Sequence, residues 1–387
     1  MNTVAQTNAA ATGVQTVDGA AAQPEPTVLF RVVNGVAIIT LNRPSALNAL
    51  SHDMVRELTV LIERCRTDGE IVAVVLRGAG DKGFCAGGDV RALHQAATNG
   101  NTQWRQFFID EYRLDFALHE LTKPLVVLMD GVTMGGGMGL AQGASLRVVT
   151  ERTKIAMPET RIGFIPDVGA TWFLGAMPVE LELYIGLTGV TLTGPDAISC
   201  GLADAYAPSS SLQGFEKRLH ILDRSNIRQS LRDVFVSPSN AAPHAPLTDV
   251  LPLVCEHFAA QFSILQIAES LGNALRQNPT PKDHEWLQVT LDALRAHSPL
   301  MLNVTREALL RGRQMTLGAC FRMELDLGKR AVEVGDFCEG VRAFLIDKDR
   351  SPRWMFRTLE EVNPEVVQKF FAPSWRDEAH PLRALAD

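Results

Sequence analysis

Two acidic residues stand in a segment that is otherwise mostly apolar, Met157-Pro158-Glu159-Thr160-Arg161-Ile162-Gly163-Phe164-Ile165-Pro166-Asp167. A carboxyl group among Met, Pro, Ile and Phe side chains is partly removed from water, which raises its pKa toward neutrality. Glu159 and Asp167 are therefore candidates for a general base, a general acid or a nucleophile. The alternative is a structural ion pair, for which Arg161 is the obvious partner.

Two glycine-rich segments precede these acids, and each follows a predicted strand. They are Lys82-Gly83-Phe84-Cys85-Ala86-Gly87-Gly88-Asp89 and Asp130-Gly131-Val132-Thr133-Met134-Gly135-Gly136-Gly137-Met138-Gly139. Glycines at a strand-to-helix junction let backbone N–H groups lie close to a ligand. Two such loops, each ending a strand of one sheet, can donate two N–H groups to a single oxygen, which is an oxyanion hole. Either loop alone is explained as well by a tight packing turn.

The spacing of other residues argues against several further chemistries. Neither glycine segment completes GxGxxG or the Gly-Lys of a Walker A loop, so a nucleotide-phosphate loop is not indicated. The chain has no GxSxG and no HExxH, and its nine histidines show no ligand spacing. The six cysteines form no CxxC pair, and Cys85 is interpreted as a small packing residue. We therefore expect no metal site and no redox cofactor.

The elements that position these residues alternate between strand and helix. Val28–Val33 and Val36–Leu41 are β-rich runs joined by Asn34-Gly35, which is the strongest short hairpin signal. Further strands are predicted over Ile71–Leu76, Leu125–Met129, Leu146–Thr150 and Lys154–Met157, and helices over Met54–Cys65 with Ser51 as cap, Trp104–Leu121 and Gly137–Ala144. This alternation indicates βαβ units and a largely parallel sheet, which is an α/β fold.

After about Tyr206 the pattern becomes mostly helical. A Pro-rich loop is predicted over 237–248, and helices over Val254–Leu271, Pro281–Ala296, Pro299–Arg311 and Leu317–Val334. The sequence therefore divides into a disordered N-terminal tail (1–26), an α/β core (27–206) and a mostly helical C-terminal region (207–387).

Composition sets outer limits on function. The 387 residues carry 37 Lys+Arg and 44 Asp+Glu, a net charge of −7, with 46% hydrophobic residues, as in ordinary globular proteins. This mild acidity disfavours nucleic-acid binding, which needs clustered basic residues. The first 26 residues have neither the basic start nor the apolar centre of a signal peptide, and no transit-peptide arginines. We expect a cytoplasmic protein that does not contact a membrane.

The residues singled out above resemble, in order, the motifs of the crotonase (enoyl-CoA hydratase/isomerase) superfamily. The resemblance rests on Phe84–Asp89, the triplet Gly135–Gly137 and Pro158-Glu159, and covers about residues 27–206. It implies a spiral of ββα units with a helical C-terminal region, and an acyl-CoA thioester as ligand. It also implies that the N–H groups of Gly88 and Gly136 form the oxyanion hole, with Gly87, Asp89 and Gly135 at the same substrate site. Such proteins often assemble as homo-oligomers.

One branch of the superfamily is closer than the others. Hydratases of this superfamily use two glutamates. In this sequence Gly139 stands at the position of the first glutamate, and Glu159 matches the second. Asp167 is an addition, and the segments around Gly139, Glu159 and Asp167, with Asp336–Ala343 and 347–354, resemble the 3-hydroxyisobutyryl-CoA hydrolase family. That family's pattern implies that the substrate site is lined by Glu111, Gly136, Glu159 and Asp167. The run after Asp167 departs from the glycine-richer family pattern, and 207–295 matches weakly.

We therefore expect hydrolysis of a short-chain 3-hydroxyacyl-CoA, with 3-hydroxyisobutyryl-CoA giving 3-hydroxyisobutyrate and CoA in valine catabolism. Glu159 and Asp167 are the predicted catalytic residues, and CoA arrives with the substrate rather than as a cofactor. Within enzymes the alternative is an enoyl-CoA hydratase or isomerase, which the loss of a glutamate at Gly139 disfavours. Outside enzymes the alternative is a non-catalytic acyl-CoA-binding protein.

Overall fold

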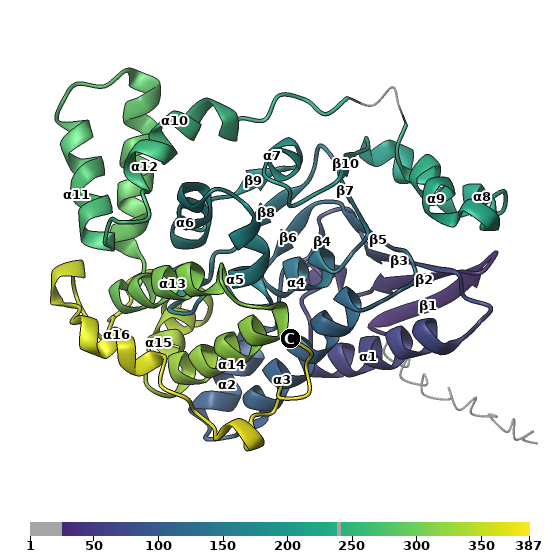
Figure 1. The fold of residues 1–387 in the computed structure, drawn as a ribbon, viewed down its shortest axis with the longest axis horizontal. Helices are drawn as coiled ribbons and strands as arrows, with labels where there is room; N and C mark the ends of the chain where they lie inside the picture. The colour runs from purple at the N-terminus through teal and green to yellow at the C-terminus, as the bar shows by residue number, and fades with distance from the viewer. Residues whose placement is uncertain (1–24, 238–240) are drawn as a thin grey trace, which may run out of the picture.

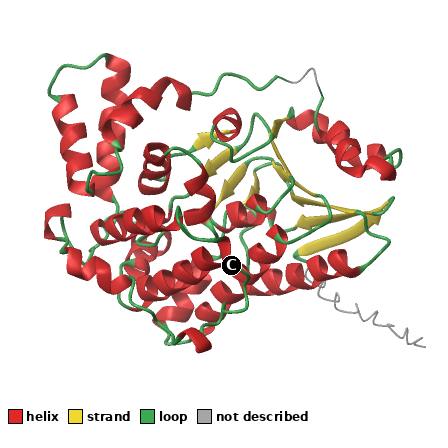
Figure 2. Ribbon diagram, viewed as in Figure 1, coloured by secondary structure: helices red, strands yellow, loops and turns green. Residues whose placement is uncertain are grey.

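The computed structural model describes residues 25–237 and 241–387. In these ranges the chain forms two β-sheets before residue 207, and helices follow them (Figures 1 and 2). This confirms the predicted α/β class and the helical C-terminal region. The tail predicted to be disordered lies, except for residues 25 and 26, outside the described residues. Among the helices that the structure describes, none is long and apolar enough to cross a membrane.

The larger sheet has six strands in the order β1-β2-β3-β5-β7-β10. Only β1 runs antiparallel to its neighbour, and β2 onward form a parallel sheet, as the βαβ pattern predicted. The turn between β1 and β2 places Asn34 and Gly35 at φ of 47° and 78°, as the hairpin signal requires. The strands are β1 (Val28–Val33), β2 (Val36–Leu41), β3 (Ala73–Gly78), β5 (Leu125–Met129), β7 (Leu146–Val149) and β10 (Ala205–Tyr206).

A second, four-stranded sheet carries both glycine segments, as expected for two loops that each end a strand of one sheet. Its order is β4 (Gly83–Cys85), β6 (Val132–Met134), β8 (Lys154–Ala156) and β9 (Leu192–Thr193). The first glycine segment contains β4, and the second contains β6. Of these strands only β8 was predicted, as Lys154–Met157. β4, β6 and β9 have two or three residues, which gives too little apolar periodicity to be recognised in the sequence, whereas pairing with neighbours stabilises them in the fold.

The helices of the core follow the strands closely. Ser51 caps α1 by accepting a hydrogen bond from the Met54 N–H, as predicted. Both predicted helices further along are present as α3 and α4, each shifted by one or two residues. The core helices are α1 (His52–Thr67), α2 (Val90–Thr98), α3 (Gln103–His119), α4 (Gly136–Gln142), α5 (Ala170–Phe173), α6 (Val179–Thr188) and α7 (Gly194–Ser199).

The C-terminal region contains the predicted long helices with one correction. The helical pattern over Val254–Leu271 is interrupted, because Ser263 forms a capping box with Gln266 and starts a new helix. Leu247 already lies in a helix, so the Pro-rich loop ends earlier than predicted, and 238–240 within it lie outside the described residues. The helices are α8 (Phe215–Leu219), α9 (Ile227–Phe235), α10 (Leu247–His257), α11 (Ile264–Leu275), α12 (Pro281–Ala296), α13 (Pro299–Gly312), α14 (Leu317–Glu333), α15 (Phe337–Val341), a π-helix (Arg342–Ile346) and α16 (Pro364–Phe370).

One apolar cluster joins the core to the C-terminal helices. It extends from Val28 in β1 to Leu382 near the C-terminus and includes Phe164, Phe321 and Phe337. Phe164 stacks on Phe108 of α3 and contacts the Phe337 ring of α15. Burial of these large rings therefore fixes α14 and α15 against the part of the core that carries the predicted site.

Candidate active site

Three neighbouring parallel strands deliver the three predicted motifs to one edge of the smaller sheet. β4 pairs with β6, and β6 pairs with β8, all in the same direction. Gly87 and Gly88 follow the end of β4, and Gly135 and Gly136 follow the end of β6. Glu159 follows the end of β8. Because the carboxyl ends of parallel strands lie at one edge of a sheet, segments more than 70 residues apart meet there.

The two glycine loops touch each other through their backbones. A Cβ atom on Gly87 would lie 3.1 Å from the Met134 carbonyl oxygen and 3.3 Å from the Gly136 nitrogen. Gly87 and Gly135 also have φ of 96° and 49°, in the region that favours glycine. Within the described residues, no protein acceptor takes the N–H of Gly88, nor that of Gly136 at the first position of α4. Both N–H groups are therefore available to a ligand.

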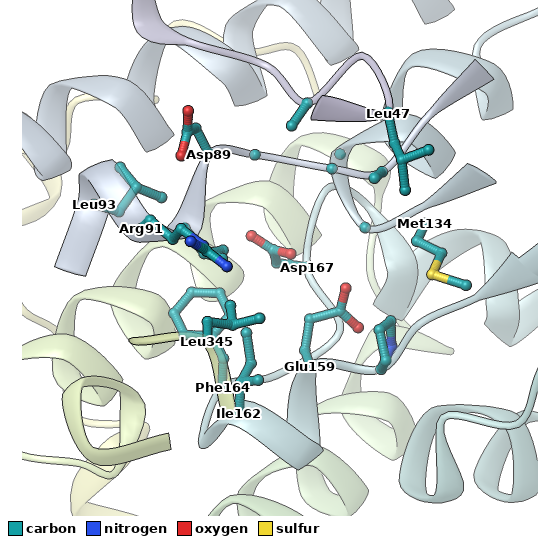
Figure 3. Close-up of a pocket in the computed structure, with 18 of the residues that line it drawn as sticks. Leu47, Asp89, Arg91, Leu93, Met134, Glu159, Ile162, Phe164, Asp167 and Leu345 are labelled. Carbon is teal, nitrogen blue, oxygen red and sulfur yellow. The ribbon is translucent and has the colours of Figure 1, made fainter. Parts of the chain in front are cut away.

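All eight predicted site residues line a single cavity of about 850 Å³: Gly87, Gly88, Asp89, Glu111, Gly135, Gly136, Glu159 and Asp167. Figure 3 shows Glu159 and Asp167 reaching from separate turns into the same space, with Arg91 and Leu345 nearby. Asp89 lies at the edge of this group, where it caps α2 and pairs with Arg43 at 3.1 Å. Its position therefore also has a structural explanation.

Helix α3 supplies the buried acid that the family resemblance pointed to. Phe108, Glu111, Tyr112 and Asp115 recur at intervals of three and four residues, so they share the face of α3 that packs inward. The carboxyl group of Glu111 lies against α4, since a Cβ on Gly136 would be 2.3 Å from Glu111 Oε1. A carboxyl group thus lies beside one of the two candidate N–H donors.

Tyr112 is a site residue that sequence reasoning missed. Its hydroxyl donates a hydrogen bond of 2.5 Å to Asp167 Oδ2, and the pair is buried. The signal was present in the sequence, because Tyr112 follows Glu111 directly and shares its helix face with the apolar Phe108. Only the fold, however, brings residue 112 to residue 167.

Burial dominates the electrostatics of the site. It raises the pKa of Glu159 well above the usual range, and the charge of Asp167 raises it further. It raises the pKa of Asp167 to about 7, although the hydrogen bond from Tyr112 opposes this rise. The pKa of Glu111 is also raised, by burial and then by Asp167. Asp167 can therefore exchange protons near neutral pH. Burial keeps Glu159 and Glu111 protonated to a higher pH than in water.

The structure tests two structural interpretations from the sequence, Arg161 as an ion-pair partner of Glu159 and Cys85 as a packing residue. Arg161 lies over the Phe344 ring, 5.0 Å from its centroid, and among the described residues it forms no ion pair with Glu159, whose Oε2 has no hydrogen-bonding partner there. Glu159 is therefore not half of a structural salt bridge. Cys85 is completely buried, and burial raises the pKa of its thiol to about 12. The interpretation of Cys85 as a packing residue is consistent with both facts.

The C-terminal region forms part of the cavity wall, which the sequence analysis did not assign. Phe337, Phe344, Leu345 and Arg350 all line the cavity, and Phe344 and Leu345 lie in the π-helix. Arg350 joins three arginines from the core at the cavity, Arg43, Arg91 and Arg161. These four arginines place cations at the cavity beside its acidic side chains, although the overall charge is −7.

The space around Gly139 is already filled. A Cβ there would lie 2.5 Å from Asp115 Oδ2 and 2.7 Å from Val168 Cβ. Asp115 is fully buried, and neither of its oxygens has a hydrogen-bonding partner among the described residues. The site therefore has no room for a glutamate at position 139 without movement of α3 or of the turn that carries Asp167.

Comparison with known proteins agrees with this geometry. The sequence profile of the enoyl-CoA hydratase/isomerase family matches residues 36–371. The chain is 40% identical over 347 residues to mitochondrial 3-hydroxyisobutyryl-CoA hydrolase from Gallus gallus, covering 89% of each chain.

Two solved structures extend the similarity to three dimensions. A carnitinyl-CoA dehydratase from Mycobacterium thermoresistibile has 35% identity and a TM-score of 0.80, over 90% of this chain and 96% of that one. An enoyl-CoA hydratase from Rhodobacter sphaeroides 2.4.1 has 36% identity and a TM-score of 0.79, over 90% and 98%. With paired glycine loops at the ends of adjacent strands, a buried glutamate facing them and a family match over most of its length, this chain belongs to the enoyl-CoA hydratase/isomerase (crotonase) family.

Proposed function

We propose that this protein is an acyl-CoA thioester hydrolase that converts 3-hydroxyisobutyryl-CoA and water to 3-hydroxyisobutyrate and CoA. The observation that carries the proposal is the buried Glu159 opposite Gly88 and Gly136, in a site where Gly139 replaces a second glutamate. The 40% identity to a protein named for this reaction supports the same substrate. Valine catabolism is the setting that this substrate suggests.

The free N–H groups of Gly88 and Gly136 would bind the thioester oxygen and stabilise its negative charge as the carbonyl carbon becomes tetrahedral. By analogy with other oxyanion holes, each donor contributes on the order of 3 kcal/mol to the transition state. Both N–H groups are fixed in the backbone before substrate arrives, so little reorganisation is needed.

Glu159 would act on the carbonyl carbon in one of two ways. As a general base it removes a proton from water, the water oxygen bonds to the carbon, and the C–S bond breaks to release CoA. As a nucleophile it forms a mixed anhydride with loss of the CoA thiol, and water then cleaves the anhydride. Asp167 would either orient the 3-hydroxyl group of the substrate or assist Glu159.

The anionic CoA portion would be held by the four arginines at the cavity, Arg43, Arg91, Arg161 and Arg350. Guanidinium groups suit phosphate because they donate in a planar fork and stay charged. Independence from metals and cofactors, a cytoplasmic location and assembly as a homo-oligomer stay predictions from the sequence.

The test is release of free thiol from 3-hydroxyisobutyryl-CoA, measured with a disulfide dye. Glu159→Gln should remove nearly all thiol release, because the amide can act neither as base nor as nucleophile. Glu182→Gln is the matched control, since Glu182 is also buried but bonds to Arg313 and does not line the cavity. Near-normal turnover in Glu159→Gln would falsify the role of Glu159.

An enoyl-CoA hydratase or isomerase is the second candidate, because two solved relatives carry hydratase or dehydratase names. The crowding at Gly139 by Asp115 and Val168 disfavours it. Incubation with an enoyl-CoA separates the two, since loss of enoyl absorbance without thiol release indicates hydration. Binding of both CoA esters with neither reaction would instead indicate a non-catalytic acyl-CoA-binding protein.

A further inference from the structure

Glu324, in the middle of helix α14, has a fully buried carboxyl group that the proposed chemistry does not use. It does not line the cavity. Its partners all belong to the turn after Asp167: Gly169 N donates to Oε2 at 2.7 Å, while Thr171 N and Thr171 Oγ1 donate to Oε1 at 3.0 and 2.7 Å. Burial raises the pKa of Glu324 to about 8, although these hydrogen bonds oppose the rise. A buried carboxyl group is tolerated when hydrogen bonds satisfy its oxygens, as here.

The turn held by Glu324 has an unfavourable backbone. Val168 has a φ of 56°, which is a rare conformation for a β-branched residue, and Gly169 follows at 85°. Such conformations are energetically unfavourable and persist only where the surroundings enforce them. The Ala170 N–H bonds back to the Asp167 carbonyl at 2.9 Å, so the strained residues and Asp167 form one turn.

Helix α14 holds Asp167 from a second direction through aromatic contacts. Phe321, one helical turn before Glu324, has its ring 5.6 Å from that of Tyr112, whose hydroxyl bonds to Asp167. The same Phe321 ring would be 3.2 Å from a Cβ on Gly169. Both the backbone and the carboxyl group of Asp167 are therefore supported by groups that α14 contacts.

We propose that Glu324 is a positioning residue for Asp167, through which the C-terminal region sets where that carboxyl group stands in the cavity. The inference rests on the proposed function, because it gives the position of Asp167 a catalytic consequence. It adds a residue more than 150 positions away in the sequence to the machinery of the site.

Glu324→Gln tests this with little change of volume. The amide oxygen can keep the two bonds from Thr171, but the amide NH₂ then faces the Gly169 N–H, donor against donor. We expect kcat/KM for 3-hydroxyisobutyryl-CoA to fall about 10- to 100-fold, as small displacements of catalytic groups do. Thr171→Val, which removes only one donor, should give a smaller loss in the same direction.

A double-mutant cycle with Asp167→Asn separates positioning from general damage. If Glu324 acts through Asp167, Glu324→Gln should cause almost no further loss once Asp167 is Asn. Where turnover of the Asn variants is too slow, affinity for a non-hydrolysable thioether analogue of the substrate, measured by calorimetry, completes the same cycle. Glu182→Gln, a buried glutamate outside the cavity wall, should leave kcat/KM near wild type in both backgrounds.

Two outcomes overturn the inference: no loss in Glu324→Gln, or the same factor of loss with and without Asp167. A failure of the proposed function looks different. In that case Asp167→Asn itself would keep wild-type turnover and affinity, or the wild-type protein would release no thiol from the substrate.

Discussion

At the scale of single residues, the site depends on carboxyl groups that the fold has buried close together. Glu111, Glu159 and Asp167 line one cavity, and Asp115 lies just behind it with no partner among the described residues. Burial disfavours the charged form of each, and each ionised neighbour disfavours it further. Their protons are therefore coupled, and a change at one carboxyl group should be felt by the others.

This coupling predicts the pH dependence of turnover. Glu159 must be ionised in either of its proposed roles, so kcat/KM should rise with pH over a range well above the usual glutamate pKa of 4.5. A nearby negative charge opposes ionisation, and Asp167, with a pKa of about 7, carries that charge above neutrality. Asp167→Asn should therefore move the rising limb to lower pH while reducing the plateau. The measurement is the kcat/KM profile from thiol release; an unmoved or raised limb would contradict the coupling.

At the scale of elements, the close approach of α4 to α3 explains why position 139 is glycine. The carboxyl group of Asp115 on α3 and the Val168 side chain occupy the place of a side chain there. Val168 is also the strained residue next to Asp167. The packing of α4 against α3 and the position of Asp167 are therefore linked through Gly139.

Gly139→Ala should accordingly lower stability by about 1–3 kcal/mol, the usual cost of overpacking, although alanine favours a helix. It should also reduce kcat/KM, because the added methyl group pushes on Val168. Gly69→Ala is the matched control, since a Cβ at Gly69 meets nothing within 4 Å. Urea midpoints and thiol release measure both effects. A wild-type urea midpoint and a wild-type kcat/KM in Gly139→Ala would contradict this prediction, because the turn at Val168 would then accommodate the methyl group without loss of stability or activity.

At the scale of the whole molecule, the C-terminal region completes both the core and the site. The backbones of the core and of the C-terminal region touch each other directly. A Cβ on Gly340 would be 2.2 Å from the Ile162 carbonyl oxygen, and a Cβ on Gly163 would be 2.3 Å from the Asp336 carbonyl oxygen. The apolar cluster also includes residues on both sides of residue 206. The domain boundary between residues 206 and 207 stays a prediction.

The shared cluster predicts the behaviour of the isolated core. A fragment of residues 25–206 should not unfold cooperatively and should release no thiol, because it exposes apolar surface that α13, α14 and α15 cover and lacks Glu324 and Arg350. Circular dichroism during urea titration, with the full chain alongside, measures this. A cooperative transition in the fragment would show that the core folds without the helices that cover it.

The sequence by itself determined the parts that depend on local chemistry. The hairpin at Asn34-Gly35, the long helices and the parallel strands follow from turn preference and apolar periodicity, and the glycine loops and Glu159 carried enough pattern to identify the family. All eight predicted site residues line one cavity. Six of them follow strands β4, β6 and β8 of the small sheet, whereas Glu111 lies on α3 and Asp167 lies in the turn before α5.

Only the tertiary structure decided contacts between distant segments. The short strands β4 and β6 exist because neighbours pair with them, and the bond from Tyr112 to Asp167 joins residues 55 positions apart. The packing of the C-terminal helices brings Glu324 within hydrogen-bonding distance of the turn after Asp167. The same packing places Phe344, Leu345 and Arg350 in the cavity wall. No local pattern specifies such pairings, because burial and hydrogen bonding select them from the whole fold.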